Sequence, residues 1–239
     1  MSEILPTTHL HIGAIIFPAI DQIDFTGPFE ILSRLPNSTF HVLWKDRMPL
    51  KDGKGLILTP DTTFAESSPL NLLVVPGGIG QEALMDDEVV LSFIREQAAQ
   101  ADYVLSVCTG ALICGAAGLL RGKRAATHWN SFHLLEYFGA IPVNERVVQD
   151  GNFVFASGVT SGLDGALGVA ALLRGDLVAQ EIQLQTQYAP EPPFTSGTPE
   201  TAPSAVLQAA QQAVQSISSA RLATAQRIAA RLGINKKLV

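Results

Sequence analysis

Strand-like and helix-like patterns alternate along the first three quarters of the chain. Apolar runs typical of buried strands alternate with segments in which apolar residues recur at helical spacing. The strand-like runs are 9–17, 39–45, 70–78 and 103–107, and the helix-like segments are 18–35, 87–101, 109–120 and 161–176. This alternation predicts an α/β fold, a three-layer sandwich with a largely parallel central sheet. Ligands of such sheets bind beyond the carboxyl ends of the strands.

Two shorter signals indicate antiparallel pairing. Residues 55–64 suggest a short antiparallel excursion beside the sheet. Asp150-Gly151 lies between two apolar runs within 146–156. Because Asp-Gly favours the tight turn that joins two antiparallel strands, this segment predicts a β-hairpin.

The composition changes near residue 190. A Pro-rich stretch, 184–203, is followed by an Ala-, Gln- and Ser-rich segment with helical periodicity. The apolar face of that segment slips in phase near Ser218-Ser219, which predicts two short helices or one kinked helix. Its apolar positions are Leu207, Ala210, Val214 and Ile217, then Leu222, Ala225, Ile228 and Leu232. We therefore expect an α/β domain over 1–190 and a loop with C-terminal helices over 191–239, packed on the domain or on a partner subunit.

Charge and hydropathy bear on the partners. Of 239 residues, 47% are hydrophobic and 16% charged, and the net charge of −6 gives no global attraction to nucleic acid. The mildly basic tail (Arg221, Arg227, Arg231, Lys236 and Lys237) is interpreted as a solvated helix face. No window is long and apolar enough for a membrane span, and the N-terminus lacks the basic region of a signal peptide. We expect a cytoplasmic protein that binds neither nucleic acid nor membrane.

The two cysteines are expected to be free thiols. Cys108 and Cys114 are too few for a disulfide framework. If a helix joins them, its rise separates them by about 9 Å, whereas a disulfide needs Cα atoms within about 7 Å. The histidines show no metal-ligand spacing with one another or with the cysteines, so no metal is expected.

Cys108 is the first candidate for chemistry. The strand-like run 103–107 ends abruptly in Cys108-Thr109-Gly110, with the small residues Ser106 and Gly110 two positions to either side. This pattern is typical of a nucleophile elbow, a sharp strand-to-helix turn that exposes a reactive side chain. The helix N-terminus is expected to lower the pKa of the thiol and favour the thiolate. The alternative is a buried structural cysteine.

Three further features accompany the cysteine. Asp24, just before a Thr-Gly-Pro turn, is either an acid that exchanges a proton with substrate or a turn or N-cap residue. Backbone N–H groups of the loop Pro76-Gly77-Gly78 form either an oxyanion hole or a plain turn. His128 is either the base of a Cys-His pair or a structural histidine.

Several motifs together resemble the ThiJ/PfpI superfamily over residues 11–188. They are "DFTGP", "VVPGG", "SVCTGALICGAAGLLRGKRAATHW" and "GNFVFASGVTSGLDGAL". The resemblance implies a flavodoxin-like, class I glutamine-amidotransferase-like fold. The stretch 183–203 is similar to the branch of that superfamily that hydrates isocyanides.

The resemblance also implies roles for individual residues. Cys108 would be the nucleophile, Asp24 the acid near the sulfur, and backbone N–H groups around Gly78, Ile79 and Thr109 would hold developing charge. Thr109 stands where protease-like members have histidine, which argues against a Cys-His pair with His128. The implied reaction converts isocyanides (isonitriles) to N-substituted formamides through a covalent thioimidate, without a cofactor, in a homodimer whose sites lie near the interface.

Two other functions are compatible with the same motifs. Similar domains act as ligand sensors when fused to AraC-type DNA-binding regions, but only about fifty residues follow Tyr188, and the first part is a Pro-rich loop. A glyoxalase- or stress-protein-like member would use Cys108 on small aldehydes or as a peroxide sensor.

Overall fold

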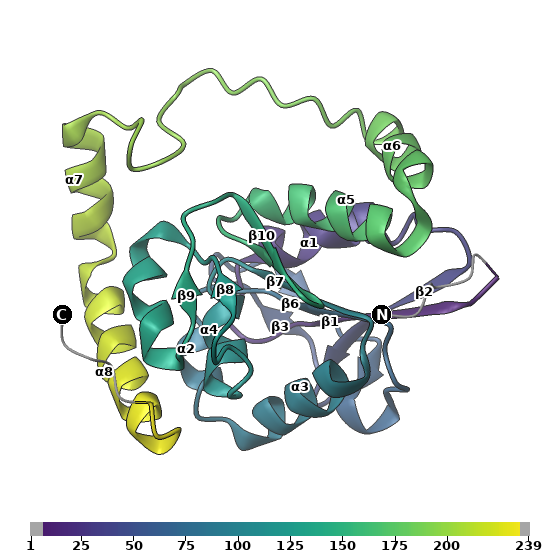
Figure 1. Ribbon diagram of the computed structural model, residues 1–239, viewed down its shortest axis with the longest axis horizontal. Helices are drawn as coiled ribbons and strands as arrows, with labels where there is room; N and C mark the ends of the chain where they lie inside the picture. The colour runs from purple at the N-terminus through teal and green to yellow at the C-terminus, as the bar shows by residue number, and fades with distance from the viewer. Residues whose placement is uncertain (1–6, 235–239) are drawn as a thin grey trace.

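A seven-stranded sheet forms the centre of the molecule (Figure 1). The computed structural model describes residues 7–234. All neighbouring strands of this sheet are parallel except β10 and β11. In spatial order they are β10 (Val147–Asp150), β11 (Phe153–Ala156), β7 (Tyr103–Val107), β6 (Leu72–Val75), β1 (Leu10–Ile15), β2 (Ser38–Trp44) and β5 (Thr62–Thr63). The predicted α/β class and the hairpin within 146–156 are confirmed.

Helices cover both faces of the sheet and complete three layers. On one face α1 (Gln22–Leu32) packs against α5 (Ser161–Arg174), and α5 also packs against α6 (Asp176–Gln185). The other face carries α2 (Gln81–Leu84), α3 (Glu88–Gln100) and α4 (Gly110–Ala116). Every residue of β6 and β7 is buried, as expected of strands covered on both faces.

The excursion predicted at 55–64 is only partly antiparallel. Strand β4 (Ile57–Leu58) pairs antiparallel with β3 (Leu50–Lys51) in a small separate sheet, whereas β5 joins the main sheet parallel to β2. Another small sheet joins β8 (Arg124–Ala125) and β9 (Ile141–Pro142). Segments η1 (Phe64–Glu66) and η2 (Trp129–Phe138) are 3₁₀ helices.

The helix after Cys108 is shorter than predicted. It ends at Ala116 rather than Leu120, because Gly118 adopts φ +82°, a left-handed conformation that stops a helix. Within α4, Gly115 lies against the ring of Phe138: a Cβ built there would be 2.5 Å from Phe138 Cγ. The missing side chain therefore lets η2 approach α4 closely.

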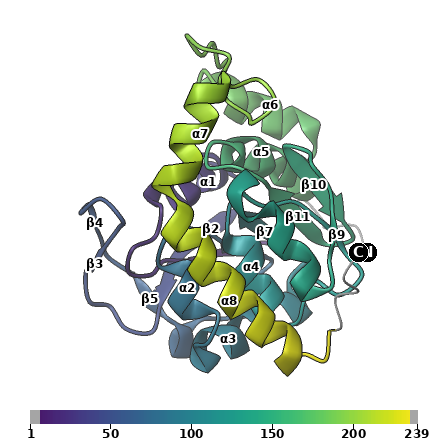
Figure 2. The same cartoon turned by 90° about the vertical axis from the view of Figure 1, so that its left-hand side faces the viewer.

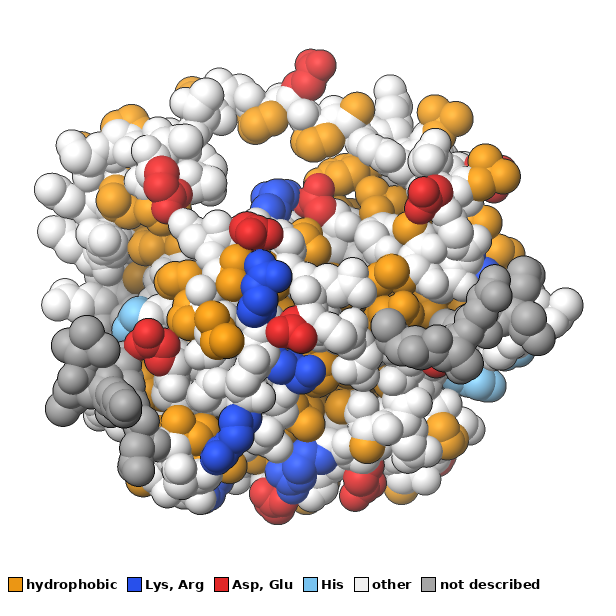
Figure 3. Space-filling model, in the orientation of Figure 1, with side chains coloured by type: hydrophobic (Ala, Val, Ile, Leu, Met, Phe, Trp, Pro, Cys, Tyr) orange, Lys and Arg blue, Asp and Glu red, His pale blue; other side chains and the backbone are white. Residues whose placement is uncertain are grey.

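The C-terminal segment forms a loop and two helices. The loop that follows α6 crosses the molecule to α7 (Ser204–Ala213), and α8 (Gln215–Arg231) continues along η2 and α2 (Figure 2). The helices divide at Val214, four positions before the predicted slip. In Figure 3 open space separates the loop from the surface below it. No helix within 7–234 combines the length and apolarity needed to cross a membrane.

The basic tail is not wholly a solvated face. Arg227 and Arg231 are partly exposed, as predicted, but Arg221 is only 5% exposed. Arg221, Ala225 and Ile228 share the face of α8 that turns inward, because residues four and seven positions along a helix lie on the same side. Lys236 and Lys237 lie outside the described residues.

Candidate active site

Cys108 occupies the sharp turn that its neighbours predict. Its backbone has φ +55°, a left-handed conformation that is strained for a residue with a side chain, at a cost of about 1–3 kcal/mol. The turn is held on both sides: Cys108 N–H donates to the Ala156 carbonyl (2.9 Å), and Thr127 Oγ1 donates to the Cys108 carbonyl (2.7 Å). A Cβ on Gly110 would lie 1.9 Å from the Val75 carbonyl oxygen, so a glycine is required two positions after the cysteine.

Asp24 lies beside Cys108 with no exposed surface. It belongs to the first turn of α1, whose N-cap is Asp21, so the N-cap interpretation of Asp24 is wrong. Asp24 Oδ2 accepts a hydrogen bond from Gly77 N–H at 3.0 Å. Its other oxygen, Oδ1, has no hydrogen-bond partner among the described residues and remains free to handle a proton.

Burial raises the pKa of both groups, whereas the hydrogen bond between them lowers the pKa of Asp24 and raises that of the Cys108 thiol. Burial raises the pKa of Asp24 to about 8, and the charge of Asp21 adds to the shift. Burial also raises the pKa of the Cys108 thiol, followed by the charge of Asp24, while the Thr109 N–H and the charge of Arg221 act in the opposite direction. The expectation of a lowered thiol pKa is therefore wrong, because desolvation and a buried carboxyl group outweigh the end of one short helix.

The glycine loop is tied to the elbow. Gly78 N–H donates to Thr109 Oγ1 at 3.1 Å, which contradicts the expectation that this N–H is free to hold developing charge. The backbone at Gly78 has φ +131°, and a Cβ there would lie 2.2 Å from Asp21 N, so the close approach of the two loops needs glycine. Gly78 also pairs with Ile20 in an isolated antiparallel bridge, which places the Ile79 N–H opposite the Ala19 carbonyl.

A surface cleft near the site is lined in part by Ile79. Its side chain is half-exposed and lines a cleft of about 320 Å³ together with Asp21, Lys54 and Leu56. This cleft lies where the β3–β4 hairpin approaches the start of α1. Apolar and charged side chains therefore border the loop that carries Gly77 and Gly78.

His128 does not form a hydrogen bond with Cys108 in the described part of the chain. It caps η2, and its Nδ1 donates to Asn130 Oδ1 at 2.7 Å. Burial lowers the pKa of the imidazole, and the Asn130 hydrogen bond partly opposes this. These contacts agree with the argument against a Cys-His pair.

Cys114 lies inside α4 with no exposed surface, and burial raises its pKa to about 12. It is an inert structural thiol by these criteria. Both cysteines are free, as predicted.

The family of the chain follows from its similarity to known proteins. The model of the DJ-1/PfpI family matches residues 11–171. The chain belongs to the DJ-1/PfpI family. The matched range begins in β1 and ends in α5, so it contains Asp24, the glycine loop and the Cys108 elbow.

Individual relatives in the DJ-1/PfpI family are similar to this chain beyond residues 11–171. An isonitrile hydratase from Pseudomonas putida is 50% identical over 225 residues, covering 94% of this chain and 99% of its own. The crystal structure of a ThiJ/PfpI family protein from Pseudomonas syringae superposes with a TM-score of 0.88 at 36% identity, covering 93% of this chain and 91% of that one. Drosophila melanogaster DJ-1beta shares the fold, with a TM-score of 0.70 at 21% identity over 77% of this chain and all of that one.

One residue at this DJ-1/PfpI site comes from outside the family match. Arg221 of α8 donates from one guanidinium nitrogen to the Gly78 carbonyl (3.1 Å) and from another to Ser131 Oγ (3.3 Å). The sequence pattern predicted that Arg221 lies on a solvated helix face. Its helical spacing from the apolar residues Ala225 and Ile228 is the signal that could have predicted a buried position.

Proposed function

We propose that this chain hydrates isocyanides to N-substituted formamides, with Cys108 as nucleophile and Asp24 as proton carrier. The observation that carries the proposal is the buried Cys108–Asp24 pair at a strained elbow, where burial raises the pKa of both groups and the charge of Asp24 raises that of the thiol further. The 50% identity to an isonitrile hydratase, over nearly the full length of both chains, supports this substrate class.

The reactive state holds one proton on the pair. Because the charge of an ionised Asp24 raises the pKa of the Cys108 thiol, loss of one proton from the pair makes loss of the second harder. The Thr109 N–H and the charge of Arg221 favour the thiolate, and the unpartnered Asp24 Oδ1 has room for the proton. A carboxyl group with a pKa of about 8 is a proton donor near neutral pH.

In the first step the Cys108 thiolate attacks the terminal carbon of R–N≡C. An S–C bond forms, and the proton of Asp24 passes to the same carbon. The product is R–N=CH–S–Cys108, a covalent thioimidate, and Asp24 is left as a carboxylate.

In the second step water adds to the thioimidate carbon. The Asp24 carboxylate takes one proton from the water and passes it to nitrogen, giving R–NH–CH(OH)–S–Cys108. The C–S bond then breaks, sulfur leaves as thiolate, and the hydroxyl proton returns to Asp24. The formamide R–NH–CHO is released with the pair restored, so the balance of atoms and protons needs no cofactor.

Backbone groups beside the pair would hold the charges that develop. The Thr109 N–H contacts the sulfur and stabilises it as attacking and leaving thiolate. The Ile79 N–H is the candidate donor to the substrate, whereas Gly78 N–H acts through Thr109 by fixing the loop.

We also propose a homodimer in the cytoplasm. Leu177, Leu184 and Phe194 each expose more than 70% of their surface on α6 and the loop that follows it. That loop roofs a cleft of about 650 Å³ whose lining includes Arg146 and Tyr188. A second copy of the chain would cover these apolar side chains, and a reducing compartment would keep both thiols free.

The test is turnover of an aryl isocyanide, followed by formamide formation. Cys108→Ala should abolish turnover, and Cys114→Ala, the same change at a thiol buried away from the pair, should retain it. Mass spectrometry of a rapidly quenched reaction should find the substrate mass added at Cys108. Turnover by folded Cys108→Ala protein would overturn the proposal.

A further inference from the structure

Helix α8 carries a buried cation into the site. Arg221 is 5% exposed, and its guanidinium donates to the Gly78 carbonyl at 3.1 Å and to Ser131 Oγ at 3.3 Å. Gly78 and Arg221 are 143 positions apart in the chain. The third guanidinium nitrogen, Nε, has no hydrogen-bond partner among the described residues.

The other arginines of α8 behave differently. Arg227 forms an ion pair with Asp86, and Arg231 lies 3.7 Å from the same carboxylate, all at the surface. Arg221 forms no salt bridge with a carboxylate within residues 7–234. A buried charge without a partner of opposite sign is costly, so its position calls for a group nearby that becomes negative.

Cys108 is such a group. Arg221 and Cys108 interact electrostatically, and Glu82 is the other negative group that acts on Arg221. The guanidinium therefore lies in the field of a sulfur that is anionic when it attacks substrate and again when it leaves.

We propose that Arg221 is a positioning residue of the active site: it holds the Gly78 carbonyl and places a buried positive charge beside the Cys108 sulfur. The inference rests on the proposed function for its kinetic consequence, but not for its effect on the thiol. The C-terminal helix thus completes a site whose other residues all lie within 11–171.

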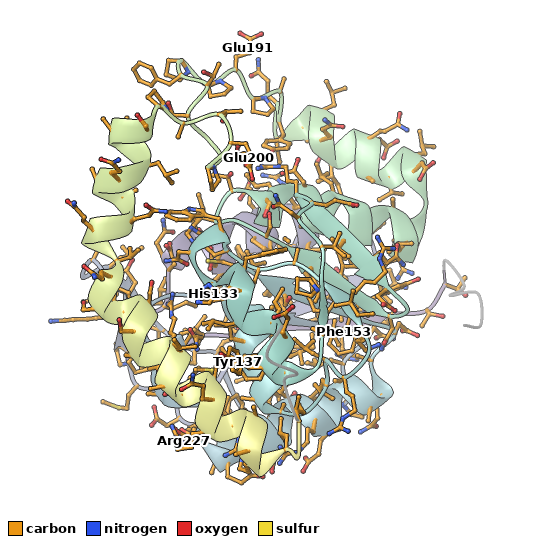
Figure 4. The ribbon with its side chains drawn as sticks, turned by 60° about the vertical axis from the view of Figure 1, so that its left-hand side comes forward. His133, Tyr137, Phe153, Glu191, Glu200 and Arg227 are labelled. Carbon is orange, nitrogen blue, oxygen red and sulfur yellow. The ribbon has the colours of Figure 1, made fainter. Side chains whose placement is uncertain are left out.

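A chain of hydrogen bonds holds the guanidinium in place. Ser131 Oγ accepts from Arg221 and donates to Asn130 Oδ1 (3.1 Å), and the same Asn130 oxygen accepts from His128. Residues of η2 therefore orient Arg221. Figure 4 shows α8, with Arg227 labelled, lying across η2, which carries His133 and Tyr137.

The hydrogen bond from Arg221 to Gly78 also affects the elbow, because Gly78 is hydrogen-bonded to Thr109. While the Gly78 carbonyl accepts from Arg221, the Gly78 N–H donates to Thr109 Oγ1. Both faces of this peptide segment are thereby fixed, and with them the Ile79 N–H that follows. Loss of Arg221 leaves the Gly78 carbonyl with the 3.4 Å contact from Thr109 Oγ1 and removes the charge near the sulfur in one change.

The experiment compares Arg221→Met, which keeps most of the aliphatic volume, with Arg221→Lys, which keeps the charge. Arg227→Met is the matched control, because it removes a cation from the same helix at the surface. The first readout is the pH profile of Cys108 alkylation by iodoacetamide, with the Cys114→Ala background ensuring that one thiol reacts. The second is kcat and KM for an aryl isocyanide.

Arg221→Met is expected to lower the alkylation rate near neutral pH by about tenfold, as its profile moves about one unit upward. It should lower kcat by about tenfold or more with little change in KM. Arg221→Lys should keep the alkylation profile and lose about threefold or more in kcat, because one ammonium replaces the fork that spans Gly78 and Ser131. Arg227→Met should change neither readout.

A folded Arg221→Met protein with an unchanged alkylation profile and unchanged kcat would overturn the inference. If Arg221→Met does not fold, full kcat in Arg221→Lys would overturn the role assigned to the Gly78 carbonyl. Alkylation of Cys108 needs no isocyanide, so the two proposals can fail separately. If Arg221→Met shifts the alkylation profile but the wild-type protein does not turn over isocyanides, the proposed function is contradicted and the role of Arg221 is supported.

Discussion

Thr109 Oγ1 accepts a hydrogen bond from Gly78 N–H at 3.1 Å, and this contact joins the ends of β6 and β7. The two residues follow neighbouring parallel strands, whose carboxyl ends lie at the same edge of the sheet. A Cβ at Gly77 would lie 2.5 Å from the same Thr109 oxygen, so the loops are in tight contact. The hydroxyl of Thr109 therefore acts as a brace between the glycine loop and the nucleophile elbow.

Replacing Thr109 by valine tests this brace. Thr109→Val keeps the shape but leaves the buried Gly78 N–H without an acceptor, which costs about 1–3 kcal/mol of unfolding free energy. We expect kcat for isocyanide hydration to fall about tenfold or more. Thr109→Ser, which keeps the hydroxyl, should stay within about threefold of the wild type. Equal activity of the valine and serine variants would contradict the brace.

Asp24 should make the protein less stable as the pH rises. Its folded-state pKa, about 8, lies above the ordinary aspartate value of 3.8, so between these values the folded protein holds a proton that the unfolded chain has lost. Ionisation thus favours unfolding: the destabilisation is absent below about pH 4, grows by up to about 1.4 kcal/mol per unit, and is complete above about pH 8.

Asp24→Asn should remove this dependence. In a Cys108→Ala background, which excludes titration of the thiol, urea unfolding is measured between pH 5 and 8 with and without Asp24→Asn. The stability advantage of the asparagine variant should increase steadily with pH. A constant difference would show that Asp24 ionises at an ordinary pKa in the folded protein. In the Cys108 enzyme, the same substitution should reduce turnover by at least about a hundredfold.

Gly110 and Gly168 offer a matched pair of helix glycines. A Cβ on Gly110 would lie 1.9 Å from the Val75 carbonyl oxygen, whereas a Cβ on Gly168 meets nothing within 4 Å. Gly110→Ala should destabilise the protein by about 3 kcal/mol or more and disturb the elbow. Gly168→Ala should stabilise it by about 0.5–1 kcal/mol, because alanine favours a helix. Thermal unfolding of both variants measures the contrast, and similar melting temperatures would contradict it.

Local patterns predicted most of the architecture. Strand β7 was expected at the bounds it has, because five consecutive buried residues between a helix and a glycine-rich turn allow few alternatives. The elbow could also be predicted from the sequence, since Ser106 and Gly110 supply the space that a sharp turn needs. The early end of α4 could not be predicted, because three glycines in one segment left the position of the left-handed residue open.

The sequence by itself determined the order of the strands along the chain, the turn at Cys108 and the family to which its motifs belong. These depend on residues adjacent in the chain, whose sterics and hydrophobic periodicity act locally. Only the tertiary structure decided the direction of the thiol pKa and the place of Arg221. Asp24 and Arg221 reach Cys108 from distant segments, and burial of charge depends on every element packed around it. A helix end considered alone therefore predicted the wrong sign for Cys108.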